Sequence, residues 1–175
     1  MLYRKEVKKR MNIFLPDENL NNCVEALDDR RLVKQILECY QIYNSKREGS
    51  YSHHPVILFY TKYPFFIIRY GLAACNEFRY RFERAHAYEN FFINEFYKEV
   101  QKSKQIDWEI PFYYAEGSKD DPKHIRTTSN VPQLFRQKLC KKWLNDKFPP
   151  KWTKRGAPDF FTNGLVQPIY IKEDN

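Results

Sequence analysis

The chain has 175 residues, which is long enough for one folded domain with a single sizeable core. Hydrophobic residues make up 42% of the sequence and aromatic residues 17%, so a disordered chain is excluded. The formal net charge of +8 at pH 7 favours a polyanionic partner, and nucleic acid is the leading class.

The four cysteines are widely spaced and form no CxxC pair, so we expect a reducing compartment and no disulfide framework. No spacing of cysteine and histidine supports a zinc site. The most apolar run, residues 56–72, is interrupted by Lys62, Pro64 and Arg69 and does not predict a transmembrane span. We therefore expect an intracellular protein, cytoplasmic or associated with the nucleoid, with no cofactor, no metal, no membrane association and no obligate protein partner.

The first ten residues form a basic lead-in, in which five cations against one glutamate carry half of the total net charge. The apolar run that begins at Met11 ends at Pro16, and Met11 would make a natural start for the globule. We predict an N-terminal extension over residues 1–10, one domain over 11–161 and a C-terminal tail over 162–175.

Residues 27–43 predict the helix around which the fold is organised, with the asparagine pair 21–22 as a candidate N-cap. An apolar stripe at steps of three and four residues predicts its buried face: Ala26, Val33, Ile36, Leu37, Tyr40 and Tyr43. Arg31, Lys34 and Glu38 share a different face. This charged face is either a functional surface or a solvated one with a Lys34–Glu38 pair.

His54 precedes a short apolar helix predicted over residues 56–63. Residues 65–100 form the longest helical stretch, with a break predicted near Ala87. Gly71 within this stretch can let a neighbouring helix approach closely.

Residues 101–130 are rich in loop signals, and a strongly cationic last helix is predicted over residues 132–147. The segment 151–161 mixes aromatic side chains with cations, which suits either phosphate and base contacts or a tail packed onto the core. The fold class is therefore mainly α, a single-domain helical bundle with a loop-rich C-terminal third.

The common hydrolase and nucleotide-binding signatures are absent from the sequence. Five blocks do occur in order: Met11-Asn12-Ile13-Phe14, residues 27–38, His54-Pro55, residues 75–82 with His86, and Trp152-Thr153-Lys154-Arg155 with Pro158. Together, across residues 11–161, they resemble the phage and bacterial family labelled pyrimidine dimer DNA glycosylase-like, a distant relative of the endonuclease V of T-even phages. The usage of Lys, Asn, Tyr and Phe suggests an AT-rich genome, phage or viral.

The resemblance implies a DNA glycosylase, with or without AP-lyase activity, that excises a damaged or modified base from duplex DNA. In endonuclease V an N-terminal amine attacks the sugar C1′, and a glutamate on the first long helix assists. The alignment places Glu38 at the position of that glutamate, Asn12 at that of the amine and Arg31 where that enzyme has histidine. Asn12 has a free amine only in a chain that starts at Met11 and loses it; otherwise Lys34 or water takes its place.

The resemblance and the charge pattern give the following predicted DNA contacts: Arg30, Arg31, Arg81, Arg84, His86, Trp152, Lys154 and Arg155. His54 and Glu77 are predicted to belong to the site or to a structural network around it. An alternative is that Glu77, Arg81 and His86 form a buried network joining two helices. Trp152 could equally pack in the core.

Two other functions stay open on the sequence. One is a non-catalytic nucleic-acid-binding protein, and the other is an enzyme acting on a small nucleotide or modified base. Salt dependence separates them, because binding to DNA weakens steeply with salt and action on a small molecule does not.

Overall fold

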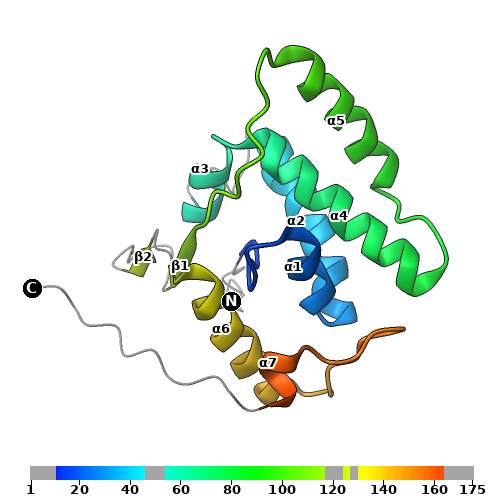
Figure 1. The fold of residues 1–175 in the computed structure, drawn as a ribbon, viewed down its shortest axis with the longest axis vertical. Helices are drawn as coiled ribbons and strands as arrows, with labels where there is room; N and C mark the ends of the chain where they lie inside the picture. Colours follow the sequence, from blue (N-terminus) through cyan, green and yellow to red (C-terminus); the bar gives the residue numbers. More distant parts are fainter. Residues whose placement is uncertain (1–10, 46–53, 117–123, 127–129, 164–175) are drawn as a thin grey trace, which may run out of the picture.

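The computed structural model describes residues 11–45, 54–116, 124–126 and 130–163. Its elements, in chain order, are α1 (Leu20–Ala26), α2 (Asp29–Asn44), α3 (Pro55–Tyr60), α4 (Pro64–Phe82), α5 (Glu89–Lys102), β1 (Tyr114–Glu116), β2 (His124–Arg126), α6 (Val131–Asn145) and α7 (Asp159–Thr162) (Figure 1). The prediction of a mainly α fold is confirmed. The predicted extension 1–10 and most of the predicted tail lie outside the described residues.

Helix α4 is the centre of the packing and contacts α1, α2 and α5. Aromatic side chains join α2 to the start of α5, where the rings of Tyr40 and Tyr88 stack with centroids 4.2 Å apart. Helices α6 and α7 lie at the opposite end of the molecule from α5 (Figure 1). Among the described helices, none has both the length and the apolar composition that a membrane span needs.

The helix predicted over residues 27–43 is α2, and a separate short helix, α1, precedes it. Asn19 caps α1, because its side-chain oxygen accepts the backbone N–H groups of Asn21 and Asn22 at 2.9 and 3.3 Å. The prediction that the pair 21–22 caps the helix is therefore wrong, since both residues lie inside α1. Leu27 and Asp28 have extended backbones, and Asp28 is the N-cap of α2.

The buried face of α2 differs from the predicted apolar stripe. Val33 and Leu37 are 39% and 38% exposed, so their prediction as core residues is wrong, whereas Ile36 is fully buried. The buried residues of α2 are Leu32, Gln35, Ile36, Glu38, Cys39 and Ile42. The polar side chains of Gln35 and Glu38 lie on this face because they form hydrogen bonds with backbone groups of the buried segment 11–15, which precedes α1.

The predicted break in the long helical stretch is confirmed between α4 and α5. Glu83 ends α4 in the left-handed region, with φ 54°. The predicted close approach at Gly71 is also confirmed, because a β-carbon there would overlap the ring of Phe92 on α5. Phe92 is fully buried at this contact.

The C-terminal third contains one feature that the sequence pattern did not predict, the antiparallel pair of β1 and β2. After α6, an irregular segment leads to α7, the last helix among the described residues. The indole of Trp143 on α6 contacts Trp152, Phe160 and Phe161, with ring centroids 5.1, 5.9 and 5.0 Å away. Residues 151–163 are thus packed onto the core.

Candidate functional site

The segment Met11–Leu15 is buried and is held by the side chain of Gln35. Gln35 Nε2 donates to the carbonyl of Asn12 at 2.6 Å, and Gln35 Oε1 accepts the backbone N–H of Phe14 at 2.8 Å. The Tyr70 hydroxyl donates to the carbonyl of Phe14 at 2.6 Å. The glutamine amide therefore pairs with this segment as a neighbouring strand would.

Glu38 lies one helical turn further along α2 and is only 4% exposed. Its Oε2 accepts a hydrogen bond from Gln35 Nε2 at 2.5 Å, and the backbone N–H of Asn12 also donates to this carboxylate. Its Oε1 lies 3.4 Å from Lys34 Nζ. Burial raises the pKa of Glu38 to about 7, against the opposing effect of Lys34, Asn12 and Gln35.

One ammonium group, that of Lys34, lies beside this carboxylate, and a second, that of Lys138, lies beside Asn12. The Lys34 side chain is 54% exposed. Lys138 on α6 brings its Nζ to 3.5 Å from Asn12 Oδ1 and 3.3 Å from the carbonyl of Ala115. The structure thus brings together Glu38, Asn12 and Lys34, the three predicted catalytic residues. Lys138 was not singled out from the sequence, where the only signal was the cationic character of the last helix.

Arg81, a predicted DNA contact, is buried in the interior. Its guanidinium donates to Glu77 Oε1 at 2.7 Å, to Asp29 Oδ1 at 3.0 Å, and to the carbonyls of Leu27 and Glu25 at 2.7 and 2.9 Å. The side chain has no exposed surface, so a contact with a phosphate would require this network to open. Its position fits the alternative of a structural network, which joins the α1–α2 junction to α4.

Arg155 and Thr153 complete the same network from the C-terminal segment. Arg155 makes two hydrogen bonds to the Glu77 carboxylate, at 3.1 and 2.9 Å. Thr153 donates to Asp29 through its backbone N–H at 3.0 Å and through its hydroxyl at 2.7 Å. Although burial opposes the effect, hydrogen bonds from Thr153 and Arg81 hold the pKa of Asp29 below its usual value.

Arg30 and Arg31 connect the start of α2 to the residues after α6. Arg31 donates to Asp28 at 2.9 Å and to Asp146 at 2.8 Å. Arg30 donates to Asp146 at 3.1 Å and to the carbonyl of Phe148 at 3.0 Å, yet its side chain remains 51% exposed. Of the two arginines, Arg30 has the surface that a phosphate contact needs.

Arg84 and His86 lie in the turn between α4 and α5. Arg84 is exposed, with its guanidinium 5.1 Å from the centroid of the Phe78 ring. His86 Nδ1 accepts the backbone N–H of Tyr88 at 3.1 Å. Burial and the neighbouring Arg84 lower the pKa of His86, so its imidazole is neutral at pH 7.

The remaining predicted site residues make contacts within the fold. Trp152 Nε1 donates to a backbone carbonyl of α1 at 3.0 Å, which matches the core-packing alternative. Lys154 is exposed and forms an ion pair with Glu83. His54 caps α3, because its Nδ1 accepts a backbone N–H in the first turn at 3.2 Å. His54 is thus a capping residue in this fold.

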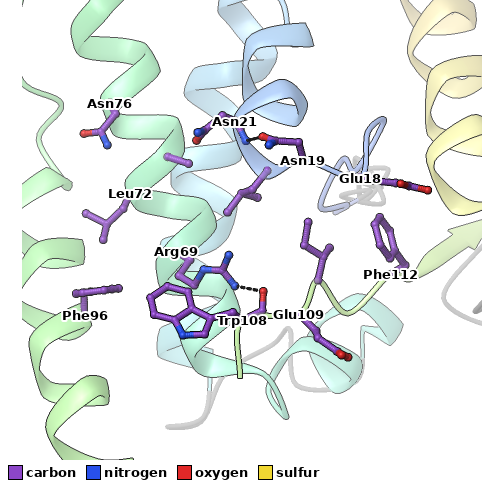
Figure 2. Close-up of a pocket in the computed structure, with 13 residues that line it drawn as sticks. Glu18, Asn19, Asn21, Arg69, Leu72, Asn76, Phe96, Trp108, Glu109 and Phe112 are labelled. Carbon is purple, nitrogen blue, oxygen red and sulfur yellow. Dashed lines mark hydrogen bonds between the residues drawn. The ribbon is translucent and has the colours of Figure 1, made fainter. Parts of the chain in front are cut away.

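A wide groove of about 820 Å³ lies elsewhere, between α1, α4, α5 and residues 108–112 (Figure 2). Figure 2 shows Arg69 and Trp108 among the residues that line it, and the arginine donates to the Trp108 carbonyl at 2.7 Å. None of Asn12, Lys34 and Glu38 lines this groove. The groove is therefore not where the predicted catalytic residues lie.

Over the described residues, no group of three or more His, Cys, Asp or Glu side chains is arranged to hold a metal ion. A buried carboxylate with a pKa near neutrality, beside the ammonium group of Lys34, defines a candidate acid–base site.

Residues 11–90 match the model of a family described as pyrimidine dimer DNA glycosylase. This match confirms the resemblance that the sequence blocks carry, for the range that contains Asn12, Lys34 and Glu38. At the family level, it supports a DNA glycosylase. The chain matches no curated protein and no solved structure.

Proposed function

We propose that this chain is a DNA glycosylase that excises a damaged or modified base from duplex DNA, with Glu38 as its catalytic carboxylate. The observation that carries the proposal is the Glu38 site itself. A carboxylate only 4% exposed, within the family-matched range, lies between the backbone of Asn12 and the ammonium group of Lys34. A purely solvated ion pair would not be buried in this way.

The chemistry of base release calls for such a group. Departure of the base leaves positive charge on the sugar at C1′, and a nearby carboxylate stabilises that charge. Because the pKa of Glu38 is about 7, the group can also take up or release a proton near neutral pH. The base must leave the stack before the protein can reach C1′, as in other enzymes that act on bases.

For AP-lyase activity, an amine must form a covalent bond with the sugar, and Lys34 is our first candidate because its Nζ lies 3.4 Å from Glu38. The ammonium group of Lys34 first gives a proton to the Glu38 carboxylate, and the neutral nitrogen then attacks C1′. The bond from C1′ to the base breaks, and the base leaves with the electron pair and takes up a proton lost by the attacking nitrogen. Opening of the sugar ring, with the proton returned from Glu38 to O4′, gives a protonated imine with a hydroxyl at C4′. Loss of a C2′ proton then expels the 3′ phosphate. Asn12 could supply the amine only in a chain that begins with it, and water would give base release without strand cleavage.

The proposed DNA face combines this site with exposed cations. Lys34 lies beside the carboxylate, Lys138 lies beside Asn12, and Arg30 continues the face along the start of α2. Arg84 and Lys154, also exposed, are proposed as more distant phosphate contacts. Phosphate contacts of this kind position a duplex without reading its sequence.

The deciding experiment is incubation with a panel of duplexes carrying single damaged or modified bases, with and without borohydride. Base release shows the glycosylase, and a borohydride-trapped covalent adduct shows the imine. Loss of the adduct in Lys34→Ala assigns the amine to Lys34. Retention of the adduct only in a chain started at Asn12 assigns it to the α-amine, and base release without an adduct assigns the role to water. No base release from any duplex would refute the proposed function in favour of a non-catalytic binding protein.

A further inference from the structure

We propose that Gln35 is the positioning residue of this site, which fixes the orientation of the Glu38 carboxylate and the position of Asn12 through one side-chain amide. The proposal rests on the function proposed above, because it assigns Gln35 a part in that reaction. Gln35 does not itself reach the substrate, since it is fully buried beneath the carboxylate.

The hydrogen-bonding capacity of an amide fits this position. Gln35 Oε1 accepts from the backbone of Phe14, and the two N–H groups on Nε2 have one partner each, the Asn12 carbonyl and Glu38 Oε2. A leucine supplies none of these bonds. An ionised glutamate at position 35 would have no donor for the Asn12 carbonyl or for the Glu38 carboxylate.

These bonds also decide which carboxylate oxygen is available. Because Oε2 of Glu38 is tied to Gln35, Oε1 is the oxygen that lies toward Lys34, whose side chain is half exposed. Gln35 therefore holds one oxygen inward and leaves the other on the side where substrate would arrive. A carboxylate free to rotate would lose this alignment with C1′, and small misplacements of reacting groups cost large factors in rate.

The same bond influences the protonation of Glu38. An N–H donor favours the charged form of a carboxylate, and the bond from Gln35 is among the effects that lower the pKa of Glu38 against burial. Loss of this donor raises the pKa further. A residue that served only to pack the core would leave the titration of Glu38 unchanged.

The test uses Gln35→Leu and Gln35→Glu in the full chain, with Ile36→Val as the matched control. Ile36 is the adjacent fully buried residue of α2, and the control removes one methyl group without changing any hydrogen bond. The Glu38 carboxyl is titrated by NMR after labelling with ¹³C-glutamate, and its resonance is assigned by its absence in Glu38→Gln. Rates of base release are measured under single-turnover conditions across the same pH range.

In Gln35→Leu, the titration midpoint of Glu38 should move upward by roughly one pH unit, and base release above that midpoint should fall about tenfold to a hundredfold. Gln35→Glu should also raise the midpoint, because the second carboxylate repels the first. Ile36→Val should change neither quantity. If Gln35→Leu does not fold, Gln35→Met, which has a similar length but no amide donor, takes its place, with the same shift and rate loss expected.

An unchanged Glu38 midpoint together with an unchanged rate in a folded Gln35 variant would overturn the proposal, whatever the loss in melting temperature. The titration does not depend on catalysis. A shifted midpoint in a protein that releases no base would therefore refute the proposed function while keeping Gln35 as the residue that sets the state of Glu38.

Discussion

Glu38 is a carboxylate that is buried although it belongs to a helix with abundant exposed surface. We expect Glu38→Gln to reduce base release by roughly two to four orders of magnitude, because an amide of the same size cannot stabilise a cationic sugar or exchange a proton. Affinity for duplex DNA should hold or rise, since a negative charge near phosphates is lost. Single-turnover base release and a binding isotherm measure the two effects.

Wild-type base release in Glu38→Gln would remove the catalytic assignment and leave Glu38 as a structural partner of Lys34. Lys62→Gln is a suitable control, because Lys62 is exposed on the turn between α3 and α4 and its charge change is not expected to alter base release.

The raised pKa of Glu38 also predicts how stability depends on pH. The folded protein binds this proton more tightly than the unfolded chain does, so the contribution of Glu38 is fully favourable below its ordinary pKa of 4.5 and is lost as the pH rises toward about 7. Between pH 5 and pH 8, the free energy of unfolding of Glu38→Gln should therefore gain on the wild type by on the order of 2 kcal/mol. Parallel denaturant titrations of both proteins measure this difference, and a constant difference across the range would contradict the raised pKa.

Arg81 and Arg84 lie three residues apart and separate the structural role from the DNA-binding role. Arg81→Met leaves Glu77 and Asp29 without their buried partner and should cost about 3–5 kcal/mol of stability. Arg84→Met, at an exposed position, should change stability by about 0.5 kcal/mol or less and weaken DNA binding instead. Thermal unfolding and DNA titration of both variants check this. The reverse pattern would return Arg81 to the DNA face.

At the level of single residues, the sequence predicted part of the candidate site. Helical spacing placed Lys34 beside Glu38, and the family pattern brought in Asn12. Gln35 could not be found in the same way, because its role depends on the fold of the segment at Asn12 against α2. Lys138 reaches Asn12 from a helix more than a hundred residues later, and no periodicity in the sequence records that contact.

At the scale of elements, Gly71 is the point where α4 and α5 meet most closely. Gly71→Ala should destabilise the protein by about 1–3 kcal/mol through overlap with Phe92, although alanine is the better helix former. In a Phe92→Leu background, the same substitution should cost less, because the ring that it meets is gone. Asn76→Ala, on the exposed side of α4, is the control for helix propensity. Equal costs in both backgrounds would contradict the close contact.

Hydrophobic periodicity predicted the long elements and failed where polar groups enter the core. The break after Phe82 and the last helix were found from the sequence, within a few residues of the observed bounds. The face of α2 was misjudged because Gln35 and Glu38 count as polar in any periodic pattern. The pair of β1 and β2 has three residues in each strand, which is too short for an alternating pattern to be recognised.

For the whole molecule, the positive charge is divided between structure and surface. Arg31, Arg81 and Arg155 are engaged by carboxylates within the fold, so they contribute little to the attraction of DNA. We expect duplex binding to weaken at least about tenfold between low and moderate salt, since phosphate contacts release counterions. Fluorescence anisotropy at several salt concentrations measures this slope, and a flat response would contradict the DNA face.

Deletion of residues 1–10 removes half of the net charge, so we expect weaker binding and a shallower salt slope. Among the residues that the structure describes, the buried core starts at Met11, and we expect the melting temperature to remain nearly unchanged. A large loss of melting temperature would show that the first ten residues contribute to the fold. Replacement of the five cations of residues 1–10 by neutral residues, without deletion, separates the effect of the lost charge from that of the missing residues.

The return of residues 151–163 to the start of α2 also constrains how the protein is made. During translation, Glu77 and Asp29 leave the ribosome long before Arg155 and Thr153, and the bond from Thr153 to Asp29 spans 124 positions. Contacts between residues so far apart in the sequence form slowly. The network around Glu77 and Asp29 therefore cannot form completely until synthesis of the chain is almost finished. Residues 11–90, which carry the family signature, should therefore not fold by themselves when expressed as a fragment.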